Sequence, residues 1–164
     1  MPMNYTIVEA GIDDVEAIVD VTFRSFEDAF NKPFYMEREA AIHRWKAYMR
    51  KEHHPRDAKD PRIVYVSIIN GEIVGFVAGH LTERLGLAGE LQSIYVLPGH
   101  QQQGLGTQLV IALAKWFEKW NAKAVCVDHK GGSEGFYIKL GARPNEHGWL
   151  VWDNFLDVLN TKKE

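Results

Sequence analysis

The sequence has one cysteine, no long apolar run and no excess of basic residues, and each of these absences excludes a class of protein. With Cys126 as the only cysteine, neither an intramolecular disulfide nor a zinc site built from several cysteines can form. No apolar run approaches the roughly 18 residues that a membrane-spanning helix needs, so we expect no membrane association. The 19 Lys and Arg residues against 22 Asp and Glu residues give a net charge of -3. This balance argues against binding DNA or RNA, because such proteins usually present a basic face to the phosphates.

What remains is the composition of an ordinary globular protein. The 164 residues are 46% hydrophobic and 25% charged, which fits one domain spanning residues 1–164 with one buried core. The first residues lack the basic segment and apolar stretch of a secretory signal. Together with the single cysteine, this predicts a cytoplasmic protein.

The first half of the chain predicts a strand over Tyr5 to Ala10, two helices and a hairpin. Asp13 and Glu16 resemble a capping box that opens the first helix. Apolar residues recur in this helix near the 3.6-residue period and are expected to face the core: Val15, Ile18, Val19, Thr22, Phe26 and Phe30. A second helix over about Glu37 to Lys51 is followed by a polar loop from Glu52 to Pro61.

Alternating strands and helices are predicted for the rest of the chain. Ile63 to Ile69 and Ile73 to Leu81 form a hairpin, because Asn70-Gly71 suits a tight turn with positive φ. A strand over Glu90 to Val96, a helix beginning near Gly104 and a strand over Ala124 to Val127 follow. Because a helix separates those two strands, they are expected to pair in parallel. The remaining predictions are a helix over Ser133 to Leu140, a strand over Trp149 to Trp152 and a helical turn over Asn154 to Asn160. In the long helix that begins near Gly104, one apolar stripe is expected to face the core, and its residues are Leu105, Leu109, Leu113, Trp116 and Trp120.

The most informative segment is the loop between the strand ending at Val96 and the following helix. Backbone N–H groups at a helix N-terminus carry a partial positive charge, and glycines let an anion approach them closely, so Gly104 and Gly106 suit a pyrophosphate. A dinucleotide fingerprint would need a small residue where Leu109 stands, and a P-loop would need Gly-Lys-Ser/Thr, so neither motif is present. The alternative is that the glycines only form a tight turn.

The stretch Gln101-Gln-Gln-Gly104-Leu-Gly106 resembles the Gln/Arg-x-x-Gly-x-Gly/Ala signature of the GNAT superfamily of N-acetyltransferases. Phe136-Tyr137-Ile-Lys139-Leu-Gly141 resembles a second segment of that family, and the order of strands and helices agrees from Tyr5 to Gly141. The resemblance implies an α/β fold of the α+β type. It would have a mixed, mostly antiparallel central sheet flanked by helices, with a parallel, splayed pair of strands at the cofactor site.

The resemblance also implies where acetyl-coenzyme A, the expected cosubstrate, would bind. Ile94 and Val96 would offer backbone groups to the pantetheine arm and the acetyl carbonyl. The pyrophosphate would be held by the signature loop, whose residues are Gln101, Gln102, Gln103, Gly104, Leu105, Gly106 and Thr107. The family commonly has an asparagine where Lys130 stands here. Lys130 and Lys139 are candidates for extra positive charge, with solvated surface lysines as the alternative.

Two residues are candidates for proton transfer. Tyr137 matches the tyrosine that many family members use to protonate the departing sulfur, and the alternative is an aromatic ring packed in the core. Strand periodicity puts Glu90, Gln92, Ile94 and Val96 on one face, so Glu90 is a candidate general base, as in some branches of the family. A solvent-exposed glutamate at the strand end is its alternative. Cys126 is expected to be buried and inert, and the histidines lack metal-ligand spacing, so no metal is implied.

The acceptor is expected to be a primary amine of a small molecule. The family's acceptor pocket would be lined by aromatic residues, with Phe26, Phe30, Tyr35 and Trp149 as candidates, although these could equally belong to the core. Two alternatives remain open: a catalytically silent acyl-coenzyme A binding module, and an enzyme of the same fold that acylates a protein or peptide. A homodimer is a further hypothesis, with Trp152 or Phe155 as an exposed patch.

Overall fold

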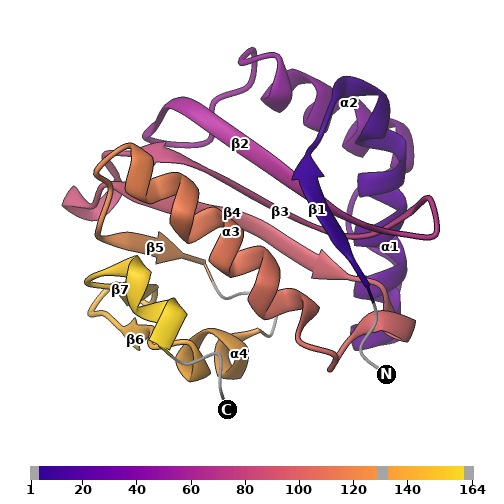
Figure 1. Ribbon diagram of the computed structural model, residues 1–164. Coiled ribbons are helices and arrows are strands. Elements are labelled where there is room, and N and C mark those ends of the chain that lie inside the picture. The colour runs from indigo at the N-terminus through magenta and orange to yellow at the C-terminus, as the bar shows by residue number, and fades with distance from the viewer. Residues whose placement is uncertain (1–3, 129–132, 161–164) are drawn as a thin grey trace.

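The computed structural model describes residues 4–128 and 133–160, and its strands and helices follow the predicted order (Figure 1). The strands are β1 (Thr6–Glu9), β2 (Ala58–Ile69), β3 (Glu72–Thr82), β4 (Gly89–Val96), β5 (Val125–Val127), β6 (Arg143–Pro144) and β7 (Leu150–Trp152). The helices are α1 (Val15–Phe30), α2 (Arg38–Met49), α3 (Leu105–Lys119) and α4 (Glu134–Lys139), with short 3-10 turns that include η1 (Ile12–Asp14) and η4 (Phe155–Asn160). No helix in these two ranges is long and apolar enough to cross a membrane.

All seven strands belong to one mixed sheet of order β1-β2-β3-β4-β5-β7-β6. Only β4 and β5 pair in parallel, which confirms the crossover predicted from the intervening helix. The β2–β3 hairpin is also confirmed, since Asn70 and Gly71 have φ values of 52° and 80°, the positive φ that a tight turn of this kind needs. The sheet is therefore mostly antiparallel with one parallel pair, as predicted.

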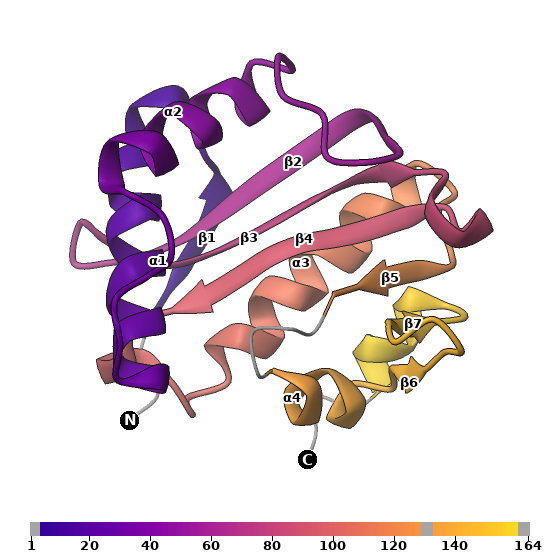
Figure 2. The same ribbon diagram turned by 180° about the vertical axis from the view of Figure 1, so that it is seen from behind.

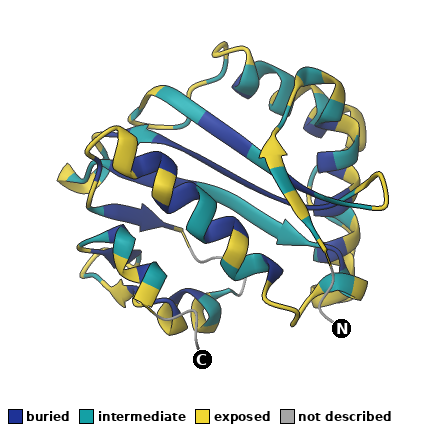
Figure 3. Ribbon diagram, in the orientation of Figure 1, coloured by how far each residue is buried: buried dark blue, intermediate teal, exposed yellow. Residues whose placement is uncertain are grey.

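Helices cover the two faces of the sheet separately. α3 crosses one face in front of β2, β3 and β4, and the C-terminal turn η4 packs beside it (Figure 1). α1 and α2 cover the other face (Figure 2). The core lies in these two interfaces, where the most buried strand segments meet the helices (Figure 3).

β4 contains a bulge that changes which side chains share a face. Ser93 pairs with Ala78 but Leu91 pairs with Gly79, so Gln92 is an extra residue. A Cβ on Gly79 would lie 2.9 Å from Leu113 of α3, so Leu91, directly opposite, also faces α3.

Beyond the bulge, the side chains of β4 alternate again. Val96 and Ile94 lie on the α3 face, since their partners Gly75 and Val77 alternate along β3 with Gly79, which faces Leu113 of α3. Gln92, Ser93 and Tyr95 lie on the α1–α2 face. The prediction that Ile94 and Val96 share a face with Glu90 is therefore wrong, because the bulge interrupts the alternation.

Several other predictions of boundary or exposure are also corrected. β2 begins at Ala58, inside the predicted loop. At the first helix, a 3-10 turn precedes α1, and Asp14 rather than Glu16 accepts a hydrogen bond from the Gly11 N–H. Phe30 is exposed rather than in the core because it lies in the last turn of α1, all of which is exposed.

The C-terminal aromatics differ most from expectation. Trp120 at the C-cap of α3 is half exposed, whereas Trp152 and Phe155 are each only 1% exposed. Phe155 packs edge-on against Phe117 of α3 and against Trp152. A dimer patch formed by Trp152 or Phe155 is therefore excluded, because both side chains belong to the core.

Candidate functional site

β4 and β5 pair over only three residues and then separate. Gly89–Leu91 pairs with Val125–Val127, whereas β4 continues as far as Val96 (Figure 2). Leu97 N donates to Val74 O at 2.8 Å. Because alternate residues of a strand direct their backbone groups to the same side, those of Ile94 and Val96 point away from β3, toward this opening. The two residues thus present main-chain groups at the opening.

One of these main-chain groups already has partners. The carbonyl oxygen of Val96 accepts hydrogen bonds from Ser25 Oγ of α1 at 2.9 Å and from Gln101 Nε2 at 2.8 Å. The Gln101 side chain therefore ties the signature loop to the end of β4, and the carbonyl of Val96 is less accessible to a ligand than the sequence suggested.

The signature loop enters α3 through left-handed backbone conformations. Gln102 and Gly104 have φ values of 62° and 78°, and Gly104 is the N-cap residue. The first intrahelical bond runs from Gln108 N to Gly104 O at 3.0 Å, so the amides of Leu105, Gly106 and Thr107 precede the regular ladder. Such amides attract an anion. The segment from Gln101 to Gly104 is solvent-exposed, and Gln103 accepts a bond from Tyr5 Oη at 3.3 Å.

The two glycines of the loop have different structural roles. A Cβ on Gly104 would meet no atom within 4 Å, so this glycine serves the positive φ. A Cβ on Gly106 would lie 3.2 Å from Cζ of Phe136. Gly106 therefore lets the first turn of α3 contact α4, which carries Phe136 and Tyr137. Lys139, at the end of α4, is exposed, and Lys130 lies outside the described residues.

Tyr137 is buried, with 4% exposure, and its ring packs edge-on against Trp152 at 5.9 Å. Burial raises the pKa of Tyr137 well above that of a free phenol, and Tyr95 and Asp128 raise it further. The phenol therefore keeps its proton at neutral pH.

Glu90 is buried rather than exposed at the end of the strand. Its Oε1 atom accepts hydrogen bonds from Arg84 Nε at 3.2 Å and from His80 Nε2 at 3.3 Å. On the other side of the imidazole, Nδ1 lies 2.9 Å from Tyr48 Oη, which is also 3.2 Å from Gly79 O, so the single phenolic proton has two acceptors within reach. This chain of contacts from Tyr48 through His80 to Glu90 has no signal in the sequence, because its members come from α2, β3 and β4.

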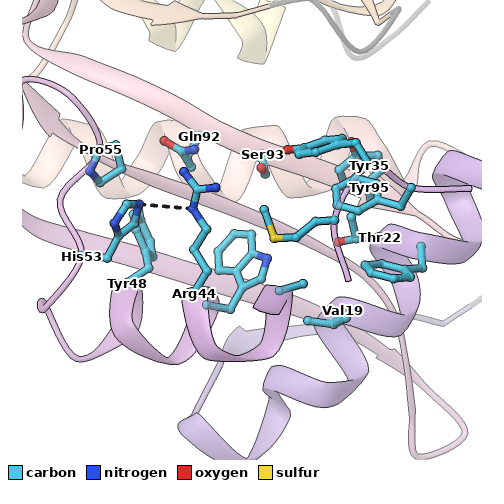
Figure 4. Close-up of a pocket in the computed structure, with 15 residues that line it drawn as sticks. Val19, Thr22, Tyr35, Arg44, Tyr48, His53, Pro55, Gln92, Ser93 and Tyr95 are labelled. Carbon is cyan, nitrogen blue, oxygen red and sulfur yellow. Dashed lines mark hydrogen bonds between the residues drawn. The ribbon is translucent and has the colours of Figure 1, made fainter. Parts of the chain in front are cut away.

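A pocket of about 150 Å³ lies between α1, α2 and β4 (Figure 4). The residues that line it are Val19, Thr22, Phe23, Phe34, Tyr35, Met36, Ala41, Arg44, Trp45, Tyr48, His53, Pro55, Gln92, Ser93 and Tyr95. The bulge supplies both Gln92 and Ser93 to this wall. Tyr48 joins the pocket to the chain that ends at Glu90.

Of the predicted acceptor-site residues, only Tyr35 lines this pocket. Phe26 lies behind it, with its ring 5.1 Å from Phe34 and 4.7 Å from Phe30. Trp149 lies instead beneath the guanidinium of Arg84, 4.7 Å from its ring centre.

The possible metal ligands and the single cysteine complete the description of the site. Within residues 4–128 and 133–160, no group of three or more His, Cys, Asp or Glu side chains could hold a metal ion. Cys126 is fully buried, as expected, and burial raises the pKa of its thiol to about 12.

Comparisons with known proteins agree with this geometry. Residues 22–142 match the model of the acetyltransferase (GNAT) family. A search of curated protein sequences found no match.

Solved structures with the same fold include several acetyltransferases. The PaiA N-acetyltransferase of Thermoplasma acidophilum, solved with coenzyme A, superposes with a TM-score of 0.68 at 14% identity over 93% of this chain and 99% of that one. A GNAT family acetyltransferase of Brucella melitensis, solved with acetyl-coenzyme A, gives 0.64 at 18% identity over 90% and 86%. One from Staphylococcus aureus gives 0.70 at 15% identity over 93% and 99%.

Proposed function

The chain belongs to the acetyltransferase (GNAT) family, and from this premise we propose that it transfers the acetyl group of acetyl-coenzyme A to a primary amine of a small molecule. The observation that carries the proposal is the position of β4 between two sites. Its open edge and the first turn of α3 border one site, and its side chains Gln92, Ser93 and Tyr95 line the other. Donor and acceptor would meet across this one strand.

The residues at the opening fit the donor. The amides of Leu105, Gly106 and Thr107 would hold the pyrophosphate, and the backbone groups of Ile94, together with the Val96 N–H, would hold the pantetheine arm. Acetyl-coenzyme A supplies the activated acetyl group as a thioester. Since the loop has no basic side chain among Gln101 to Thr107, main-chain amides and the dipole of α3 provide its attraction for phosphate.

Tyr137 is proposed as the general acid. It donates its phenolic proton to the sulfur of coenzyme A as the thioester C–S bond breaks and the amide C–N bond forms. The raised pKa of Tyr137 supports this role, because the group is protonated before the reaction, and its neighbour Tyr95 lines the acceptor pocket.

Glu90 is proposed to act as part of a relay rather than by direct contact with the amine. Tyr48 lines the pocket, and its hydroxyl would take up the proton lost by the amine and pass its own proton to His80 Nδ1. The carboxylate of Glu90 holds His80 through Nε2 and stabilises the imidazolium that forms. Tyr48 is thus the group that contacts the amine, and Glu90 positions His80.

Thermal unfolding with candidate cosubstrates tests the donor site. Acetyl-coenzyme A at a hundredfold excess over its dissociation constant should stabilise the fold by about 2.7 kcal/mol. For a chain of this size that corresponds to about 5 to 10 °C in Tm. NAD and ATP, used as controls, should have no effect. No shift at millimolar acetyl-coenzyme A would refute the assignment of the donor site.

Release of the coenzyme A thiol in the presence of an amine panel tests the reaction. Amine-dependent release with a matching acetylated product is expected. Binding of acetyl-coenzyme A without release in any arm would favour the silent binding module. Acetylation of peptides but no free amine would favour the protein acyltransferase.

A further inference from the structure

The acceptor pocket contains positive charge without a compensating carboxylate. Arg44 lines it, and none of the described residues around the pocket is Asp or Glu. Within the described chain, no carboxylate forms an ion pair with the guanidinium of Arg44. Its Nε donates to Nε2 of His53 at 3.4 Å, the dashed bond in Figure 4.

His53 adds to the same electrostatic picture. Partial burial lowers the pKa of His53, and the positive charges of Arg44 and Arg62 lower it further. His53 is therefore neutral near pH 7 and accepts the bond from Arg44. An anionic ligand group is the natural partner for the charge that remains, because a guanidinium binds a carboxylate through two parallel hydrogen bonds.

Much of the rest of the pocket wall is aromatic. Phe23, Phe34, Tyr35, Trp45 and Tyr95 line it, and Tyr35 and Phe34 lie with ring centres 4.3 Å apart. A cavity of about 150 Å³ accommodates a group of roughly the size of benzene. This wall therefore suits an apolar ring.

One residue of the pocket lining has a buried acceptor atom that still needs a donor. Oε1 of Gln92 is buried and has no hydrogen-bond partner among the described residues, although the side chain lines the pocket. A buried acceptor without a donor costs about 1–3 kcal/mol. An N–H group of a ligand would satisfy it.

We infer that the acceptor is a primary amine that also carries a carboxylate and an apolar group of about the size of a benzene ring, as an aromatic amino acid does. This inference rests on the proposed acetyl transfer. Arg44 holds the carboxylate, the aromatic wall holds the ring, and Gln92 Oε1 accepts an N–H of the amine. A polyamine would instead place further positive charge beside Arg44.

Phenylalanine and phenethylamine form a matched pair of probes, since they differ only in the carboxylate. With the wild-type protein and saturating acetyl-coenzyme A, kcat/KM for phenylalanine should exceed that for phenethylamine by about 10- to 100-fold, the range of a charge-assisted hydrogen-bonded pair. Arg44→Gln should remove most of this difference by lowering kcat/KM for phenylalanine alone. Arg50→Gln, at the exposed end of the same helix, is the control and should change neither value.

Several results would overturn the inference. One is a kcat/KM for phenethylamine or spermidine that equals or exceeds the value for phenylalanine. Another is an equal effect of Arg44→Gln on phenylalanine and phenethylamine. A further one is that no acetylated phenylalanine forms although acetyl-coenzyme A raises Tm. A peptide preferred over free phenylalanine would also contradict it. Failure of acetyl-coenzyme A to raise Tm would refute the proposed donor site instead, so the two failures are distinguishable.

Discussion

Tyr48→Phe is expected to weaken both the fold and the reaction, because the hydroxyl of Tyr48 connects α2 to β3. Tyr48 is 3% exposed, and His80 is fully buried. Removing the hydroxyl loses its bonds to Gly79 O and His80 Nδ1 and leaves the imidazole nitrogen buried without that partner. A lost hydrogen bond with an orphaned buried partner costs about 1–3 kcal/mol.

Urea denaturation measures this cost directly. The midpoint should fall while the m-value stays unchanged, since the surface exposed on unfolding is the same. In thermal unfolding the loss corresponds to roughly 2 to 10 °C in Tm. Turnover should fall by about 100-fold, the usual size of a general-base contribution.

Tyr65→Phe provides the matched control for Tyr48→Phe. The hydroxyl of Tyr65, on the partly exposed side of β2, has no hydrogen-bond partner among the described residues, so the change should stay within about 0.5 kcal/mol. If Tyr48→Phe proved as stable as this control, the bond to His80 would contribute nothing. If it lost stability but kept full turnover, the relay through Tyr48 would be wrong.

Three further predictions concern other parts of the site. Tyr137→Phe should keep acetyl-coenzyme A affinity and lower turnover by roughly 100-fold or more, and near-full turnover where chemistry limits the rate would disprove its role as general acid. Gly106→Val should lower both cofactor affinity and stability, because its side chain would push on the ring of Phe136. A smaller stability loss in Gly106→Val/Phe136→Leu than the sum of the two single losses, measured in urea, would identify that contact. Cys126 should resist iodoacetamide at pH 8.5 until the protein unfolds. Its thiol keeps its proton up to about pH 12 in the folded state, whereas the unfolded thiol loses it near pH 8.5, so Cys126 should lower stability as pH rises above that value.

Features set by neighbouring residues could be predicted from the sequence. The signature loop is one continuous segment, and its conformation depends on Gly104 and on the amides that follow, so its place at the start of α3 was predictable. The same holds for the Asn70-Gly71 turn. The parallel pairing of β4 and β5 followed from the helix between them and the known handedness of such connections.

Features set by distant contacts could not be predicted. A bulge leaves no mark in the alternation of polar and apolar residues, so the side of the sheet that Ile94 and Val96 face was assigned wrongly. Trp152 and Phe155 are buried because η4 folds back beside α3, a contact between segments far apart in the sequence. Likewise, Arg44 and Tyr48 resemble ordinary residues of an amphipathic helix until α2 is placed against β4.

The bulge at Gln92 also explains how one strand can serve both proposed sites. Without the bulge, a regular strand of the same sequence would put Leu91, Ser93 and Tyr95 on one face and Gln92, Ile94 and Val96 on the other, so the side chains that now line the pocket would be divided between the two faces. With it, Gln92, Ser93 and Tyr95 all face α1 and α2, while Ile94 and Val96 pack toward α3 and keep their backbone groups on the open edge. Deleting Gln92 would therefore remove the bulge and leave Leu91 opposite Gly79 and Ser93 opposite Ala78, as they are now. The faces of the other residues and the core under α3 would be kept, and the pocket would lose the side chain of Gln92.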